Sequence, residues 1–325
     1  MAAQDKSLIE KFEITSNSGR KADIARGVIT FSYHENVLSP MITAEVLISD
    51  TGSSIPDKDG DMTSIYTGLP ITGGERVDIK IPSTGLGPGL EFTRKNGNQL
   101  YVTSITNVMI EAEKEAFVLN LVSREAITNE TQRVGKKFIS SQKISDSVKS
   151  LIKESLLSEK NIDIDDTQNT YGFYGNMKKP FYLLTWLSSR SVSASVGGKS
   201  STAGYFFFET KNGYHFRSVD SLISANPYET EYNYTPGIID SQDPHKDFKI
   251  LKSTLTRNQK LIENLQRGAY STYRMYFNPV DATFTSQEQG TFRTSDYAEK
   301  MENLGKDFEI SLPPVDKTNK SFDVN

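Results

Sequence analysis

The sequence predicts a β-rich α+β fold in which a helical segment separates two β regions. Apolar and polar residues alternate with period two through about the first 125 residues, as they do in half-buried strands. Between 144 and 187 the apolar residues recur at helical spacing instead. Strand-like alternation then returns after a Gly/Ser-rich spacer. The order of the chain is therefore β, then helical, then β with one embedded helix.

The first region consists of strand-like runs separated by loops rich in Gly and Pro. In the first run, Ile29, Phe31 and Tyr33 alternate with polar residues. Runs at this spacing, with long intervening loops, predict an antiparallel barrel or sandwich. The runs are 29–33, 42–48 and 76–81, followed by a hairpin-like pair at 100–110 and 117–122.

Two helices are predicted in the middle region. The first runs from Ile144 to Ser155 and places apolar residues on one face at helical spacing. The second begins at Pro180, because a proline at the first helical position loses no hydrogen bond. Its apolar face contains Phe181, Leu184 and Leu187, with Trp186 beside that face.

An aromatic β-hairpin follows the spacer, and two registers are open for it. A two-residue turn at Asn212 and Gly213 would pair Lys211 with Tyr214. A three-residue loop ending at Gly213 would pair Thr210 with Tyr214. We favour the second register because it gathers four aromatic side chains on one face of the hairpin. Those four are Phe206, Phe208, Tyr214 and Phe216.

The last region holds a predicted helix over about 255–266, with its apolar residues on one buried side. Gly268 follows at the position where a left-handed residue commonly ends a helix. A strand is predicted over 270–277, where aromatic residues alternate with others. The polar tail at 316–325 is expected to fray.

The composition argues against several classes of protein. With 37 Lys and Arg against 41 Asp and Glu, the net charge of −4 argues against a general nucleic-acid binder. The absence of cysteine excludes disulfides and thiolate metal sites. The first residues are charged where a signal peptide needs an apolar core. No apolar run approaches the roughly 18 residues that span a bilayer. We therefore expect synthesis in a cytoplasm and no membrane insertion.

No group of residues has the spacing of a catalytic or metal site. Asp57, Asp59 and Asp61 resemble the start of a calcium loop. However, Met62 and Gly68 stand where that loop needs its glycine and its bidentate glutamate. The prediction is a solvated turn.

A second acidic cluster, formed by Asp163, Asp165 and Asp166, has no histidine beside it in sequence and is predicted to be solvated surface. The three histidines lack the spacing of metal ligands. We expect no catalytic, cofactor-binding or metal-binding residues, and no cofactor. The 15 Tyr and 17 Phe suit cross-strand packing, but they leave sugar-stacking sites open as an alternative.

Several segments resemble the central baseplate hub protein of T-even-like contractile-tailed phages, which is related to the N-terminal part of type VI secretion spike proteins. They occur in order between about residue 27 and about residue 285. The segments are LPITGGERVDIKI, ISSQKISDSVKSLI, KPFYLLTWLSSR, GYFFFETKNGYHFRSVDSL and LIENLQRGAYSTYRMYFNP.

The resemblance implies a homotrimer in which each chain contributes two tail-tube-like antiparallel β-barrel domains with an α+β insertion between them. Such a pseudo-sixfold ring would join the sixfold tail tube, or its initiator protein, to the threefold cell-puncturing spike. DNA would pass through the lumen of the ring without specific binding. Peripheral wedge proteins would be further possible partners of the ring. The location implied is the baseplate of the virion tail. The chain ends soon after its second β region, which leaves open how it would contact the spike.

On this basis the expected domains are 1–126, a first barrel; 127–203, a connecting α+β domain; and 204–325, a second barrel with an embedded helix and a polar tail. A carbohydrate-binding or cell-wall-hydrolysing β-domain of a phage tail is the alternative function. The residues expected to hold the structural motif are Pro180, Phe181, Trp186, Leu187, Phe206, Phe208, Asn212, Gly213, Phe216 and Gly268.

Overall fold

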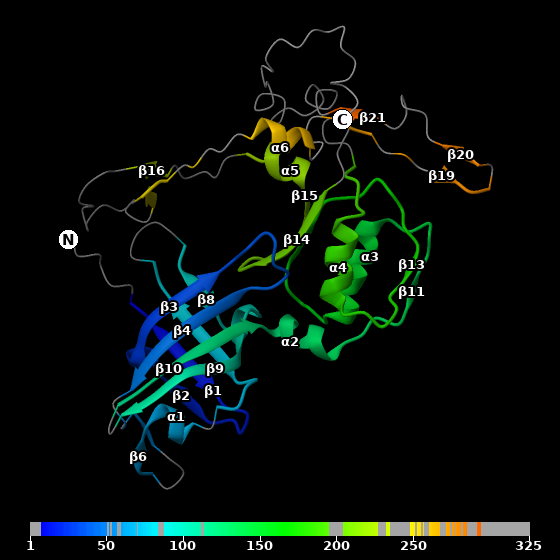
Figure 1. Cartoon of the computed structure of the whole chain (residues 1–325). Helices are drawn as coiled ribbons and strands as arrows, with labels where there is room; N and C mark the ends of the chain where they lie inside the picture. Colours follow the sequence, from blue (N-terminus) through cyan, green and yellow to red (C-terminus); the bar gives the residue numbers. More distant parts are fainter. Residues whose placement is uncertain are drawn as a thin grey trace. The chain divides into compact units, whose positions relative to one another are not determined.

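The computed structural model shows a β-rich chain with a few short helices (Figure 1). It divides into two compact units, one formed mainly by 1–194, 203–219 and 228–252, and the other mainly by 253–325. The structure describes 8–50, 52, 54–56, 60–69, 71–83, 88–111, 114–194, 204–226, 232–234, 248–250, 252–254, 256, 260–266, 271–273, 275, 277–280, 282–284 and 291–293.

The first unit begins with an antiparallel eight-stranded sheet whose strand order is β2-β1-β7-β9-β10-β4-β3, with β8 paired to β7. Long sequence separations join neighbouring strands: β1 pairs with β7, and β10 lies between β9 and β4. The strands are β1 Lys11–Thr15, β2 Lys21–Asp23, β3 Val28–His34, β4 Thr43–Asp50, β7 Arg76–Ile81, β8 Leu90–Phe92, β9 Leu100–Glu111 and β10 Lys114–Ser123.

The apolar side chains of the predicted alternation are buried on one face of this sheet. In β4 the side chains of Ala44, Val46 and Ile48 are almost completely buried, and Val77 and Ile79 of β7 are fully buried. Each valine or isoleucine side chain removed from water contributes about 1.5–3 kcal/mol. The strand predictions at 42–48, 76–81 and 100–122 are therefore confirmed.

The prediction for the first run needs one correction. A register shift between Val28 and Thr30 interrupts the pairing of β3 with β4. Because a one-residue irregularity moves a side chain to the other face, Ile29 is 60% exposed, whereas Phe31 and Tyr33 pack against the core.

The strands of this sheet close no barrel within the described residues, although Tyr33 of β3 and Phe92 of β8 approach to 5.0 Å between ring centroids. The β-rich class with a few helices is thus confirmed, and the arrangement of two barrels stays a prediction. Short elements fill the connections: η1 Ala25–Gly27, β5 Ile55–Pro56, β6 Met62–Thr63, α1 Ile65–Gly68 and η2 Arg94–Asn96.

A second core forms between helices and a three-stranded sheet, β12-β15-β14. The predicted helix at 144–155 is present as α3 followed directly by one turn of π-helix, η3, and its apolar face is buried at Ile144, Val148, Leu151 and Ile152. The elements are α2 Arg124–Thr131, β11 Lys137–Phe138, α3 Ile144–Ser150, η3 Leu151–Ser155, β12 Ile162–Ile164, β13 Phe173–Tyr174, α4 Pro180–Ser188, β14 Tyr205–Thr210, β15 Gly213–Ser218 and α5 Val219–Ser224.

The remaining described elements are short strands and one helix: β16 Asn233–Tyr234, β17 Lys249–Ile250, α6 Leu261–Gln266, β18 Ser271–Tyr273, β19 Phe277–Asn278, β20 Thr283–Phe284 and β21 Thr291–Arg293. The helix predicted at 255–266 is present as α6 over its second half. Gly268 lies outside the described residues, and so does the tail at 316–325. The division into three domains stays a prediction.

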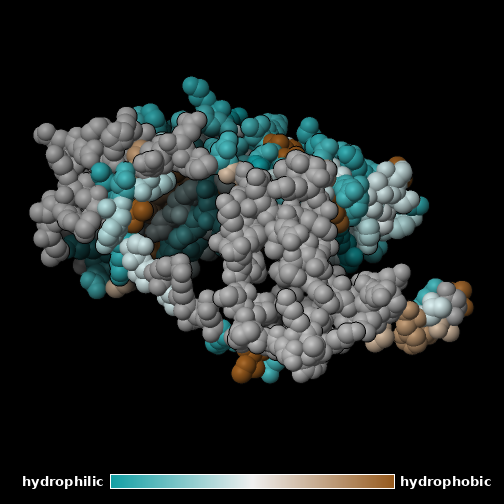
Figure 2. Space-filling model, turned by 90° about the horizontal axis from the view of Figure 1, so that it is seen from above, coloured by the Kyte–Doolittle hydropathy of each residue, from teal (hydrophilic) through white to brown (hydrophobic). Residues whose placement is uncertain are grey.

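None of the helices that the structure describes has both the length and the apolar character needed to cross a membrane. On the face drawn in Figure 2 the coloured surface is mostly hydrophilic, and hydrophobic residues occur there as small separate patches. Scattered apolar residues of this kind are ordinary on a protein surface.

Candidate functional site

Helix α4 carries the first group of predicted motif residues. Pro180 occupies its first turn, and the backbone N–H of Phe181 donates to Asn129 Oδ1 at 2.8 Å. Phe181 and Leu187 are buried in the second core. Trp186 is half-buried, and its ring meets those of Tyr171 and Phe173 edge-on, at 5.6 and 5.5 Å between centroids.

The favoured register of the aromatic hairpin is wrong. Thr210 pairs with Gly213, so the loop consists of Lys211 and Asn212 alone. Phe206 and Phe208 therefore lie on the half-buried face, where Phe208 stacks on His215. The buried face instead contains Tyr205, Phe207 and Glu209 of β14 with Tyr214, Phe216 and Ser218 of β15.

The physical reason for this register lies partly in a third strand. β12 pairs in parallel with β15, and the N–H of Tyr214 donates to the Asn161 carbonyl. A Cβ atom on Gly213 would lie 2.2 Å from that same carbonyl oxygen, and its φ is +128°. Gly213 is thus required both by the close approach of Asn161, just before β12, and by its positive φ.

The second reason is a buried ionic cluster between the two cores, which we call the junction cluster: Lys160, Glu125 and Glu209. The Lys160 ammonium lies 2.8 Å from Glu125 Oε2 and 2.5 Å from Glu209 Oε1. All three side chains are at most 4% exposed. Glu209 can face the core because Lys160 neutralises it there.

Hydrogen bonds from the first sheet complete the junction cluster. Ser123, at the end of β10, donates its hydroxyl to Glu209 Oε2 at 2.7 Å. The backbone N–H of Ile42, just before β4, donates to the same oxygen at 3.0 Å. A single carboxylate on the hairpin thus joins that hairpin to two strands of the first sheet.

The charges of the cluster perturb one another. Burial raises the pKa of the Glu209 carboxyl above its ordinary value, and the nearby Glu125 carboxylate acts in the same direction. Burial alone would lower the pKa of Lys160, but the two carboxylates outweigh it and hold that pKa above its ordinary value. Lys160 therefore stays charged in the interior.

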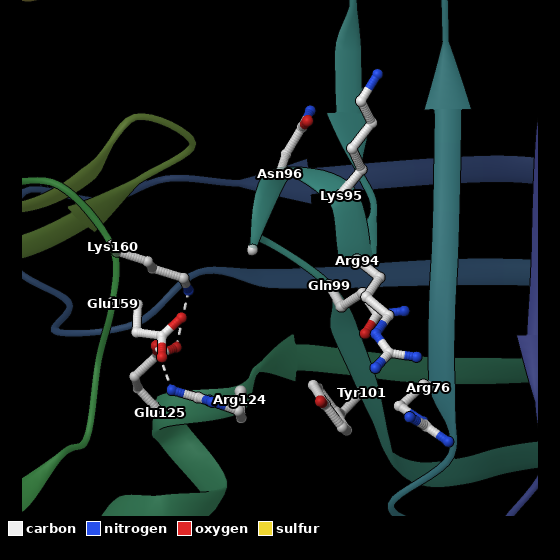
Figure 3. A pocket seen from close by; sticks show the side chains of 11 residues that line it. Arg76, Arg94, Lys95, Asn96, Gln99, Tyr101, Arg124, Glu125, Glu159 and Lys160 are labelled. Atoms are coloured by element: carbon white, nitrogen blue, oxygen red, sulfur yellow. Dashed lines mark hydrogen bonds and ion pairs between the residues drawn. The ribbon is translucent and has the colours of Figure 1, made fainter.

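A pocket of about 590 Å³ opens beside the junction cluster (Figure 3). Arg124, at the start of α2, lies on one side of it, and Arg76 of β7 lies on another, with Tyr101 of β9 between them in the view of Figure 3. The turn after β8 supplies Arg94 and Lys95. The described residues that line it are Arg76, Arg94, Lys95, Asn96, Gly97, Gln99, Tyr101, Arg124, Glu125, Glu159 and Lys160.

Positive charge predominates in this pocket, which we call the basic pocket. Its lining contains five basic side chains and two acidic ones. Lys160 and Glu125 belong to the buried junction cluster, so the basic side chains that face solvent in the pocket are the arginines and Lys95. Sequence reasoning missed both the pocket and the junction cluster. The sequence Arg94-Lys95-Asn96-Gly97 is typical of a basic turn and could have indicated part of the pocket. No pattern in the sequence predicts that Glu209 is buried.

The acidic cluster that was predicted as solvated surface forms ion pairs, mainly with side chains of β15. Arg217 contacts Asp163 at 2.7 Å and Asp165 at 3.1 Å, and Asp163 also lies 3.3 Å from His215 Nδ1. Lys143 pairs with Asp166. These aspartates are partly exposed, and no group of three potential ligands for a metal ion occurs among the residues that the structure describes.

No protein-family model matches the chain. No curated protein matches it in sequence. Among the solved structures that resemble it are two tail proteins, a component of a type VI secretion system and a Francisella PdpA-VgrG complex. None of those compared below exceeds 9% identity.

The 43 kDa tail protein of prophage MuSo2 from Shewanella oneidensis is 8% identical, with a TM-score of 0.44 over 70% of this chain and 58% of the other. The tail protein from Neisseria meningitidis MC58 is 9% identical, with a TM-score of 0.38 over 63% and 49%. An E. coli type VI secretion component, described as structurally similar to T4 bacteriophage tail proteins, is 9% identical, with a TM-score of 0.35 over 73% and 52%. The chain spans about half the length of these proteins. At such scores the similarity assigns no function by itself.

Proposed function

We propose that this chain is a structural subunit of a phage tail, the hub of a contractile-tail baseplate. The proposal starts from the ordered segments that resemble the hub family, among them KPFYLLTWLSSR and GYFFFETKNGYHFRSVDSL. In the structure these two segments form α4 and the β14–β15 hairpin, which share one core. The segments that carry the resemblance are thus elements of one packed unit.

The open sheet of the first unit is the observation that most directly supports assembly. The sheet ends at β2 and β3, and β8 pairs only with β7; none of these three strands has a second strand partner among the described residues. Unpaired edges favour association with further strands, and a closed ring of subunits removes them.

The β9–β10 hairpin adds an apolar surface beside this sheet. Val108, Met109 and Ile110 of β9 are 39%, 62% and 59% exposed. Three consecutive exposed apolar residues on a strand are unusual in a protein that stays monomeric. They would be covered if a neighbouring subunit packed against this hairpin.

From the resemblance to the hub family we infer a homotrimer that forms a pseudo-sixfold ring in the virion; the open sheet edges and the exposed hairpin are consistent with such an association. One face would bind the sixfold tail tube or its initiator, and the other the threefold spike, with wedge proteins at the periphery. The axial channel would let DNA pass during genome ejection without holding it. The protein would be assembled in the host cytoplasm and would have no enzymatic activity.

Mass measurement by light scattering at several concentrations tests this function, first for the chain alone and then with the tail-tube and spike proteins. A trimer that forms alone or on mixing supports the proposal. A chain that stays monomeric with both partners and binds neither would refute it. Clearing of purified peptidoglycan, lost on substitution of one Asp or Glu, would instead support the cell-wall-hydrolysing alternative.

A further inference from the structure

The basic side chains of the pocket fall into two groups: those that have partners within the chain and those that form no ion pair. In the first group, Lys160 is held between two buried carboxylates. Arg124 donates to the carbonyl oxygen of Leu157 at 2.5 Å and lies 3.7 Å from Glu125. These cations already have partners within the chain.

The second group consists of basic side chains that form no ion pair among the described residues. Within the part of the chain that the structure describes, the side chains of Arg76, Arg94 and Lys95 form no ion pair. The nearby Asp78 carboxylate accepts instead from the Gln99 side chain and the Arg94 backbone N–H. Three exposed basic side chains without an ion pair among the described residues therefore line one cavity.

We propose that the basic pocket binds an acidic segment of a neighbouring protein subunit, with several Asp or Glu side chains seated among Arg76, Arg94 and Lys95. A guanidinium presents paired N–H donors that match the two oxygens of a carboxylate. The volume of about 590 Å³ is far larger than a single carboxylate needs, and it accommodates a short stretch of chain. That the neighbouring protein is a tail subunit rests on the proposed function. The preference of the pocket for an acidic peptide does not depend on it.

Nucleic acid fits the pocket less well. Single strands are held by successive aromatic platforms, and among the described residues of the lining only Tyr101 is aromatic. Three unneutralised cations would release few counterions from a phosphate backbone, which gives weak binding at physiological salt. The exposed Glu159 at the rim would also repel a continuous phosphate backbone. A short acidic segment can place its charges away from Glu159.

Binding of a fluorescein-labelled hexaglutamate peptide to the full chain, followed by fluorescence anisotropy, tests the proposal. The test variant carries Arg76→Gln, Arg94→Gln and Lys95→Gln. The matched control removes three exposed cations elsewhere, with Arg26→Gln, Lys149→Gln and Lys153→Gln. We expect the peptide to bind the parent and the control alike, and the test variant about tenfold more weakly, because each exposed ion pair contributes modestly. Binding to the parent should weaken between about 50 and about 200 mM salt.

Three outcomes would overturn the proposal: no binding of hexaglutamate by the parent, equal binding by the test variant, or tighter binding of a labelled single-stranded DNA of similar length through the same three residues. If the triple variant does not fold, Arg94→Gln alone decides, with an expected loss of about threefold. Because the assay uses the isolated chain, its failure would leave the trimer measurement untouched, and failure of the trimer would leave this binding measurable.

Discussion

The ammonium of Lys160 lies 2.5 Å from Oε1 of Glu209, and both side chains are almost completely removed from solvent. Lys160 precedes β12, and Glu209 lies in the strand β14. Through Ser123 and Ile42 the same carboxylate reaches the first sheet. The contact between the two cores thus depends on one charged group and its partners.

Substitution Lys160→Met should be strongly destabilising, because it leaves Glu125 and Glu209 buried without a cation. Breaking a buried ion pair from one side costs about 3–5 kcal/mol. Urea unfolding of parent and variant measures the difference. Lys80→Met is the matched control, because Lys80 and Glu10 form an exposed surface pair whose loss should change stability little. Equal effects of the two substitutions would show that Lys160 is not held in the interior.

The pH dependence of stability should reveal Glu209. Burial raises its pKa in the folded chain, so the folded state holds a proton there more firmly than the unfolded state. This contribution is fully present below the unfolded pKa of about 4.5 and is lost as pH rises toward the folded pKa. Relative to Glu209→Gln, the parent should therefore lose unfolding free energy as the pH rises above about 4.5. A difference that grows with pH, measured by urea unfolding, would contradict the direction of this shift.

Gly213→Ala should destabilise for two reasons, positive φ and the contact with Asn161. Gly19→Ala isolates the first reason, because Gly19 has φ +87° and no atom within 4 Å of a new Cβ. We expect about 1 kcal/mol for Gly19→Ala and about 1–3 kcal/mol more for Gly213→Ala. Thermal melts of the two variants provide the comparison. If they melt together, the approach of Asn161 to Gly213 is not as close as described.

Trp186→Ala should cost about 2–3 kcal/mol, below the 3–5 kcal/mol typical of a fully buried tryptophan. Trp186 is half-buried, and its stabilisation comes from edge contacts with Tyr171 and Phe173 and from Arg190, which lies 4.5 Å from the ring centroid. Tyr182→Ala, on the exposed side of α4, is the control and should cost under about 1 kcal/mol. A loss equal to that of the control would show that Trp186 packs against nothing.

Strand and helix positions were predictable where a single period governs the residues. Val46 and Ile48 are buried because apolar and polar residues alternate along β4, and a strand with this pattern can bury both side chains on one face. Pro180 fixed the start of α4 by the same kind of local chemistry. Such elements depend on neighbours in the sequence, so their residues carry the necessary information.

The hairpin register depended on groups distant in the sequence, and there the prediction was wrong. A pattern that assigns Glu209 to the polar face cannot include Lys160, which lies 49 residues away and neutralises it. The basic pocket was missed for a related reason. Arg76, Arg94 and Arg124 come from a strand, a turn and the start of a helix, and only the folded chain brings them to one pocket.

The central claim is a threefold hub, and cryo-electron microscopy of assembled tail particles tests it most directly. The reconstruction would be computed without imposed symmetry, and the density of this chain would be located in it. The account predicts three copies around the tail axis, between tube and spike, whose neighbours cover the edge strands β2 and β3. A single copy, an even-order ring or a position away from the axis would contradict it.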